Sequence, residues 1–154
     1  MKLFFGILLL INTGCSSLTA MKHSSEELIG IWVINHASSK VDYSVIEYLP
    51  SGDKCEVEYS MSLNSSVDIK LYWNKWSFDG KIIHTVMHAT TGSIPIGYKI
   101  NDRVLKLTDD KLDVVINDPG EWGTEYHQKL LRPATGQVCD LVMASFHNQK
   151  ALNK

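Results

Sequence analysis

The 154-residue chain has few cysteines, no cluster of basic residues and only one long apolar run. Its 15 Lys and Arg residues against 17 Asp and Glu residues leave a formal net charge of −2. Nucleic-acid binding needs a positive patch that neutralises phosphates, so this balance argues against a nucleic-acid partner. With 44% apolar and 21% charged residues, the composition fits one globular domain rather than a disordered or fibrous chain.

Short motifs of common catalytic and cofactor sites are also missing from the sequence. It has no Gly-x-Ser-x-Gly elbow, no Gly-rich phosphate loop and no Cys-x-x-Cys pair, and no spacing couples its acidic residues. Among the six histidines only His84 and His88 lie close in sequence. On a strand they would stand roughly 13 Å apart, too far to share a zinc ion. We therefore expect no enzyme, no metal site and no cofactor.

The one long apolar run lies at the N-terminus, over residues 3–11, directly after Met1 and Lys2. A helix of this length rises only about 13 Å, which is too short for a bilayer core of about 30 Å. A basic start, a short apolar stretch and small residues afterwards are typical of a secretory signal peptide. The alternative is a buried N-terminal helix.

Residues 12–15 (NTGC) resemble a bacterial lipobox, in which a small residue precedes a lipidated cysteine. Asn12 stands where lipoboxes usually have leucine. The resemblance implies that residues 1–14 are a removed signal peptide and that Cys15 becomes the new N-terminus. Several acyl chains, such as palmitate, on Cys15 would anchor the protein to a membrane without spanning it.

Ser16 directly follows Cys15, and a residue of this kind at this position resembles lipoproteins that are sorted to the outer membrane. The resemblance therefore implies a cell-envelope location, at the outer membrane and facing the periplasm. Residues 15–27 are Ser-rich and polar, which indicates a lipidated tether between membrane and domain. Cleavage after Ala20 is the competing interpretation.

From Leu28 onward the dominant hydrophobic period is two, which predicts β-strands. The apolar members of these alternating segments are Cys55, Val57, Tyr59, Met61 and Leu63, then Ile69, Leu71 and Trp73, then Leu112, Val114 and Ile116. In a further segment Ile83, Thr85 and Met87 share one face, with His84 and His88 opposite. Asp79-Gly80 between two such runs is the strongest hairpin signal. Eight or nine short strands without long helical segments predict one all-β antiparallel domain, a barrel or a sandwich. After Pro133 the spacing favours a short helix, with a strand as the alternative.

Several segments, taken in order, resemble bacterial lipocalin-like domains. They are Gly30-Ile31-Trp32, Tyr48-Leu49-Pro50-Ser51-Gly52, Trp76-Ser77-Phe78-Asp79-Gly80-Lys81, Tyr98-Lys99-Ile100, Leu107-Thr108-Asp109-Asp110-Lys111-Leu112 and the segment from Tyr126 to Arg132. The resemblance covers residues 28–133. It implies a single antiparallel up-and-down barrel of about eight strands, followed by a short C-terminal helix or tail over residues 134–154.

The same resemblance implies structural roles for Gly30, Trp32 and Arg132. Trp32 of the Gly-x-Trp motif would plug the closed end of the barrel, and Arg132 on the last strand would lie over its indole. Such a cation–π contact contributes roughly 0.5–2 kcal/mol. The alternative is that Trp32 is ordinary core and Arg132 a solvated strand end.

With Cys15 assigned to lipid, Cys55 and Cys139 remain as an even pair. In an oxidising compartment, an even number of remaining cysteines suggests a disulfide. This bridge would hold the C-terminal tail on the barrel wall, as in many lipocalins. Two buried free thiols are the alternative.

The sequence supports two alternative functions, binding of a small molecule and binding of a protein partner. The first is binding of a small hydrophobic ligand inside the barrel, because eight strands leave an interior that is either filled or holds one small molecule. Candidate inward-facing ligand residues, each of which also fits a plain core role, are Val57, Tyr59, Met61, Leu71, Trp73, Met87 and Leu107. The second is a periplasmic inhibitor or immunity-type protein that binds a protein partner through exposed loops at residues 94–96 and 118–122, with Trp122 as an anchor.

Overall fold

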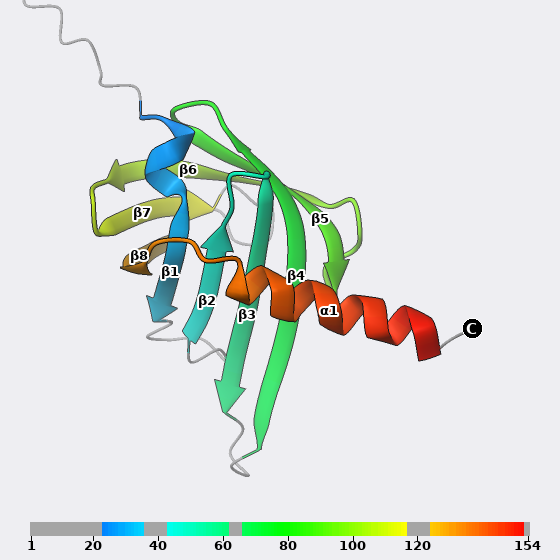
Figure 1. The fold of residues 1–154 in the computed structure, drawn as a ribbon. Helices are drawn as coiled ribbons and strands as arrows, with labels where there is room; N and C mark the ends of the chain where they lie inside the picture. Colours follow the sequence, from blue (N-terminus) through cyan, green and yellow to red (C-terminus); the bar gives the residue numbers. More distant parts are fainter. Residues whose placement is uncertain (1–22, 36–42, 62–65, 117–123, 153–154) are drawn as a thin grey trace, which may run out of the picture.

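Residues 23–35, 43–61, 66–116 and 124–152 are described by the computed structural model of the chain. They form a closed antiparallel barrel in which every strand pairs with its neighbours in sequence and the last strand closes on the first (Figure 1). The elements are η1 (Ser25–Leu28), β1 (Gly30–Asn35), β2 (Tyr43–Tyr48), β3 (Asp53–Met61), β4 (Val67–Phe78), β5 (Ile82–Thr90), β6 (Lys99–Leu107), β7 (Lys111–Ile116), β8 (Glu125–Arg132) and α1 (Gln137–Leu152). The predicted all-β, up-and-down barrel of eight strands is confirmed.

The tight turns join strands at one end of the barrel. Asp79 and Gly80 connect β4 to β5, as the sequence predicts, and Gly80 adopts a φ of 94°. The Asp79 carboxylate fixes this turn, because its Oδ1 accepts hydrogen bonds from the backbone N–H of Lys81 and of Ile82, each at 2.8 Å. A positive φ suits glycine, which has no Cβ to clash with the backbone.

The short helix η1 lies over this end, which we call the closed end (Figure 1). Leu28 at the end of η1 is fully buried, and its carbonyl accepts a hydrogen bond of 2.9 Å from Nε1 of Trp32. Tyr48 packs edge-on against Trp76, with ring centroids 5.1 Å apart. Apolar side chains therefore fill the closed end of the interior. Residues 25–27, which the polar sequence pattern assigns to the tether, belong to the helix η1 in the structure.

A second apolar cluster lies outside the barrel, beneath α1. Figure 1 shows α1 crossing the outer surface of β2, β3 and β4. The buried members of this cluster are Cys55, Val57, Cys139, Val142 and Phe146. The predicted C-terminal helix is confirmed, and the alternative of a strand is wrong. The segment folds as a helix because its apolar residues recur at helical spacing and cover an apolar sheet face.

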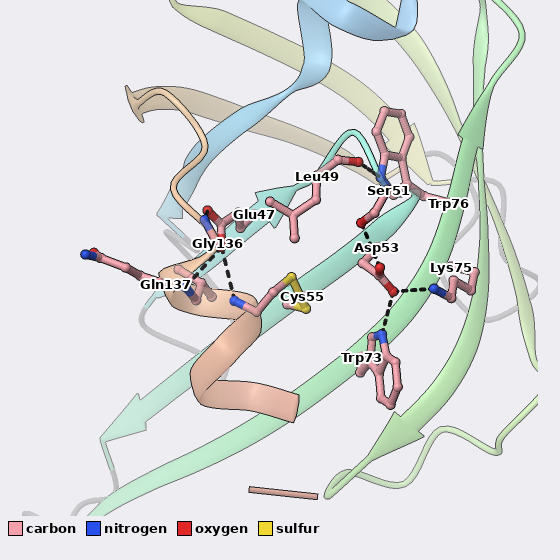
Figure 2. Close-up of a disulfide and its surroundings, with 12 residues drawn as sticks. Glu47, Leu49, Ser51, Asp53, Cys55, Trp73, Lys75, Trp76, Gly136 and Gln137 are labelled. Atoms are coloured by element: carbon pink, nitrogen blue, oxygen red, sulfur yellow. Dashed lines mark hydrogen bonds and ion pairs between the residues drawn. A yellow bond between two sulfur atoms is a disulfide. The ribbon is translucent and has the colours of Figure 1, made fainter. Parts of the chain in front are cut away.

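Two links fix the start of α1 to the barrel (Figure 2). A disulfide joins Cys55 on β3 to Cys139 on α1, with Cα atoms 5.0 Å apart, which confirms the predicted bridge between tail and barrel wall. The fully buried carboxylate of Glu47 on β2 accepts four backbone hydrogen bonds at the first turn of the helix. Their donors are the N–H groups of Thr135, Gly136, Val138 and Cys139, at 2.7 to 3.1 Å. A carboxylate in this position satisfies amides that have no partner within the helix.

Candidate functional site

The interior of the barrel contains a cavity of about 250 Å³ beside the apolar core of the closed end. Its lining differs from one side to the other. Apolar side chains come mainly from β1, β2, β6 and β7 and include Ile34, Ile46, Ile100, Val114 and Ile116. Polar and charged side chains come mainly from β3 and β4, with others from β5, β6 and β8, and include Lys54, Glu56, Glu58, Asn74, Thr85, Asp102 and Gln128.

The sequence predicts the opposite orientation for β3 and β4. In the structure Lys54, Glu56 and Glu58 line the cavity, whereas Cys55 and Val57 belong to the cluster beneath α1. Alternation separates the two faces of a strand but does not say which face is the inner one. Here the helix buries the outer face, so the apolar residues point outward and the polar residues point into the barrel.

Five of the seven candidate ligand residues therefore lie on the outer face of the barrel. Tyr59, Leu71 and Trp73 pack against the cluster beneath α1, and Met61 is 66% exposed. Their predicted inward orientation, like that of Val57, is wrong. Met87 is buried and lines the cavity, as predicted. Leu107 is also interior but belongs to the apolar core.

Lys54 is a buried cation that interacts electrostatically with two carboxylates of the lining, Glu56 on the same strand and Asp102 on β6. Burial alone would lower the pKa of Lys54, but its interactions with Tyr48, Asp102 and Glu56 outweigh this effect and raise that pKa. Burial raises the pKa of Glu56, and the neighbouring Lys54 offsets only part of this effect. Lys54 therefore stays charged, while a charged Glu56 is costly to hold in the folded protein.

Glu58 has its charge compensated within the same wall. Its Oε1 accepts a hydrogen bond from Nζ of Lys70 at 2.8 Å, and its Oε2 accepts one from the Tyr72 hydroxyl at 3.0 Å. Burial and the Glu58 charge raise the pKa of Tyr72, so its hydroxyl remains protonated and donates. With Glu58 and Lys70 paired, the other charges at the cavity are one cation, Lys54, and two carboxylates, Glu56 and Asp102.

Three buried polar atoms at this cavity make no hydrogen bond with any residue in the described part of the chain. They are Oδ1 of Asn74, Oγ1 of Thr85 and Oε1 of Gln128. Their side chains are 2%, 1% and 5% exposed. Buried polar groups in proteins almost always have a partner, and each group without one is costly. These atoms therefore mark a place where a molecule with hydrogen-bonding groups fits.

Sequence reasoning missed this polar wall although a signal for it exists. Lys54, Glu56 and Glu58 occupy alternate positions, as do Lys70, Tyr72 and Asn74 on the paired strand. Opposite Glu56 lies Tyr72, and opposite Glu58 lies Lys70. This pattern looks like an ordinary solvated sheet face, and only the helix on the other face shows otherwise.

The closed end contains Gly30 and Trp32 but not the predicted stack with Arg132. Trp32 is 1% exposed, whereas Arg132 is exposed and its Nη2 donates to Oε1 of Gln137 at 3.1 Å. Leu130 lies beside Gly30, where an added Cβ would come within 2.6 Å of its Cδ1. The predicted position of Arg132 over the indole is wrong, because the guanidinium points to the start of α1 instead.

A larger hollow of about 390 Å³ lies outside the closed end, between η1, the turn after β2 and the end of β4. It contains none of the buried polar atoms that lack a partner. The barrel interior is therefore the better candidate site. Across the described ranges no group of three or more His, Cys, Asp or Glu residues could hold a metal ion.

Comparison with known proteins adds a structural likeness. No family model matches the chain. No curated protein matches it either. Its structure is similar to the crystal structure of a lipocalin-like protein from Bacteroides uniformis ATCC 8492, with 17% sequence identity and a TM-score of 0.47. The match covers 68% of this chain and 99% of that one.

Proposed function

We propose that this protein binds one small amphipathic molecule inside its barrel. The observation that carries the proposal is the cavity of about 250 Å³, with three buried polar atoms on its lining that have no partner among the described residues. An eight-stranded barrel is wide enough for one small ligand. Pockets for drug-sized ligands measure about 300–1,000 Å³, so the expected ligand is smaller than these.

The lining also refines the kind of ligand that the sequence suggests. A purely hydrophobic molecule would bury Asn74, Thr85 and Gln128 without giving them hydrogen bonds, at a cost for each group. A molecule with one polar end and one apolar end satisfies both sides of the cavity. We therefore propose an amphipathic ligand in place of a purely hydrophobic one.

The role that we propose is binding without catalysis. Histidines in the described ranges bond to Asn101, to carboxylates or to aromatic rings, and none bonds to a serine or cysteine that could act as a nucleophile. These contacts of the described histidines therefore include none of the nucleophile–base kind that covalent catalysis uses. Binding needs only the fixed polar groups and the cavity.

Titration calorimetry with 1-hexanol tests this function on the full chain. We expect saturable one-to-one binding, which Met87→Trp abolishes because the larger ring fills the cavity. Met61→Trp is the matched control, since Met61 is 66% exposed and lies outside the cavity. If hexanol binds to both variants as it binds to the unmodified chain, its site lies outside the barrel interior, which contradicts the proposed function.

We also propose that the protein is secreted and anchored to the cell envelope through a lipid on Cys15, facing the periplasm from the outer membrane. Cys15 and the competing cleavage site at Ala20 lie outside the described residues. The Cys55–Cys139 disulfide supports the proposal, because such bonds persist in oxidising compartments. No helix in the described part of the chain is long and apolar enough to cross a membrane.

Labelling of cells with radioactive palmitate tests the anchor. We expect label in the unmodified protein and none in Cys15→Ala, which should then fractionate with soluble envelope proteins. Label that persists in Cys15→Ala would contradict the assignment.

A second candidate function is binding of a protein partner on the outer surface. Four side chains at the ends of β2, β3 and β4 form an exposed apolar set, namely Tyr43 (41%), Met61 (66%), Val67 (59%) and Ile69 (49%). Exposed apolar patches often mark interaction sites. In the loop between β5 and β6 Ile96 is 73% exposed, while residues 118–122 lie outside the described ranges. Photo-crosslinking from position 61, with exposed Lys99 as the control position, tests this candidate.

A further inference from the structure

The buried lining of the cavity contains two amide oxygens that have no hydrogen-bond donor in the described part of the chain. Oδ1 of Asn74 and Oε1 of Gln128 can only accept, and neither has a donor among the described residues. Glu56 and Asp102 add two carboxylates to the same lining, against the single ammonium of Lys54. Glu58 already receives bonds from Lys70 and Tyr72. The ligand end that faces this side must therefore donate hydrogen bonds.

The charges of the cavity lining also favour one sign of charge on the ligand. Lys54 cannot neutralise both Glu56 and Asp102, so the interior holds an excess of one negative charge when all three are ionised. A buried charge without a counter-charge is costly, and a cation brought by the ligand would compensate it. A carboxylate on the ligand would instead meet like charges in a medium of low polarity.

From these observations we propose that the ligand is a small amphipathic amine, whose ammonium group binds at Glu56, Asn74 and Gln128 and whose apolar part packs against the opposite wall. This inference rests on the proposed function and names its ligand class. An ammonium group supplies three donors and one positive charge, which are what these groups lack. The isoleucines of β1 and β7 and the buried Met87 provide the apolar contact.

Three six-carbon probes that differ only in their polar end test the proposal on the full chain at pH 7. They are hexylamine, 1-hexanol and hexanoate, and their dissociation constants are measured by titration calorimetry. An alkylammonium titrates near the lysine value of about 10.4, so hexylamine is charged at this pH. We expect hexylamine to bind about ten-fold or more tightly than hexanol, and hexanoate to bind most weakly.

Variants then assign the preference to named groups. Glu56→Gln should remove the ten-fold advantage of hexylamine over hexanol while leaving the hexanol dissociation constant within about two-fold. Asn74→Leu should weaken hexylamine more than hexanol, and this variant keeps the test valid if Glu56→Gln fails to fold. Glu125→Gln is the matched control, because Glu125 is exposed on β8 and should change nothing.

Two results would overturn the inference in different ways. If hexanol or hexanoate binds as tightly as hexylamine, the amine preference is wrong but ligand binding in the barrel stands. If none of the three probes binds, both the inference and the proposed function fail. A hexylamine preference that Glu56→Gln leaves intact would also overturn the assignment of the ammonium site.

Discussion

Oε2 of Glu47 accepts a hydrogen bond of 3.1 Å from the backbone N–H of Cys139, 92 residues further along the chain. The same cysteine is bonded through sulfur to Cys55, so one residue of α1 is held to both β2 and β3. The start of α1 is therefore fixed at a single point of the barrel wall. This attachment keeps the helix over the apolar outer face of β3 and β4 (Figure 2).

The first prediction concerns the Glu47 carboxylate. Glu47→Gln replaces one accepting oxygen with an NH₂ group that faces backbone N–H donors, and it removes the charge at the start of the helix. We expect the free energy of unfolding to fall by roughly 2–4 kcal/mol, measured by urea denaturation. Exposed Glu125→Gln serves as the control. An equal loss in both variants would show that the bonds to α1 are not the cause.

The second prediction concerns the disulfide. Thiol titration of the unfolded full chain without lipid should find one free thiol, Cys15, and three after reduction. The Cys55→Ala and Cys139→Ala double variant should lose roughly 2–5 kcal/mol of unfolding free energy, because the bridge closes a loop of 84 residues. Three free thiols before reduction would contradict the bridge.

The third prediction separates Trp32 from Arg132. Trp32→Phe removes the donor to the buried Leu28 carbonyl, so we expect a loss of about 1–3 kcal/mol in the free energy of unfolding. Arg132→Gln removes only an exposed contact to Gln137, and we expect a change within about 0.5 kcal/mol. A comparable loss in the two variants would restore the predicted stack of guanidinium on indole.

The fourth prediction is a pH effect at Glu56. Burial raises the pKa of this carboxyl in the folded state, so folding is penalised increasingly as pH rises above the unfolded value of about 4.5. We expect Glu56→Gln to be more stable than the unmodified chain at pH 7, and this gain to shrink as pH falls toward 4.5. The ionisable groups that act on Glu56 from the surrounding strands are Tyr48, Lys54, Glu58, Tyr72 and Asp102.

Urea denaturation at pH 5 and pH 7 measures the effect. The comparison with Glu125→Gln isolates the buried position, because Glu125 is exposed. A Glu56→Gln variant that is less stable at pH 7 would show that a charged Glu56 stabilises the fold. If the variant is more stable and also loses its preference for an amine, then Glu56 serves binding at the expense of stability.

Much of the fold could be predicted because its signals are local. The period of two and the Asp79-Gly80 turn depend only on neighbouring residues, and they predicted the strands and the β4–β5 hairpin. The helical spacing after Pro133 likewise predicted α1. The pairing of Cys55 with Cys139 was predicted from the number of cysteines once the lipobox resemblance had assigned Cys15 to lipid.

The candidate site could not be predicted in the same way, because it depends on which strand face is inside. Val57 and Glu56 are adjacent, and their alternation is equally compatible with either side. Arg132 is a similar case, since the position of its guanidinium depends on where Gln137 at the start of α1 lies.

The sequence by itself determined an all-β antiparallel domain followed by a C-terminal helix, because hydrophobic period and turn residues act over short ranges. The resemblances to lipocalin-like domains and to a lipobox added the barrel and the cysteine pair. Only the tertiary structure decided that β3 and β4 turn their charged face inward. The reason is that α1 covers the other face, so burial of Val57, Leu71 and Trp73 occurs outside the barrel. Lys54, Glu56 and Asp102 therefore line the interior, and the cavity is partly polar instead of purely hydrophobic.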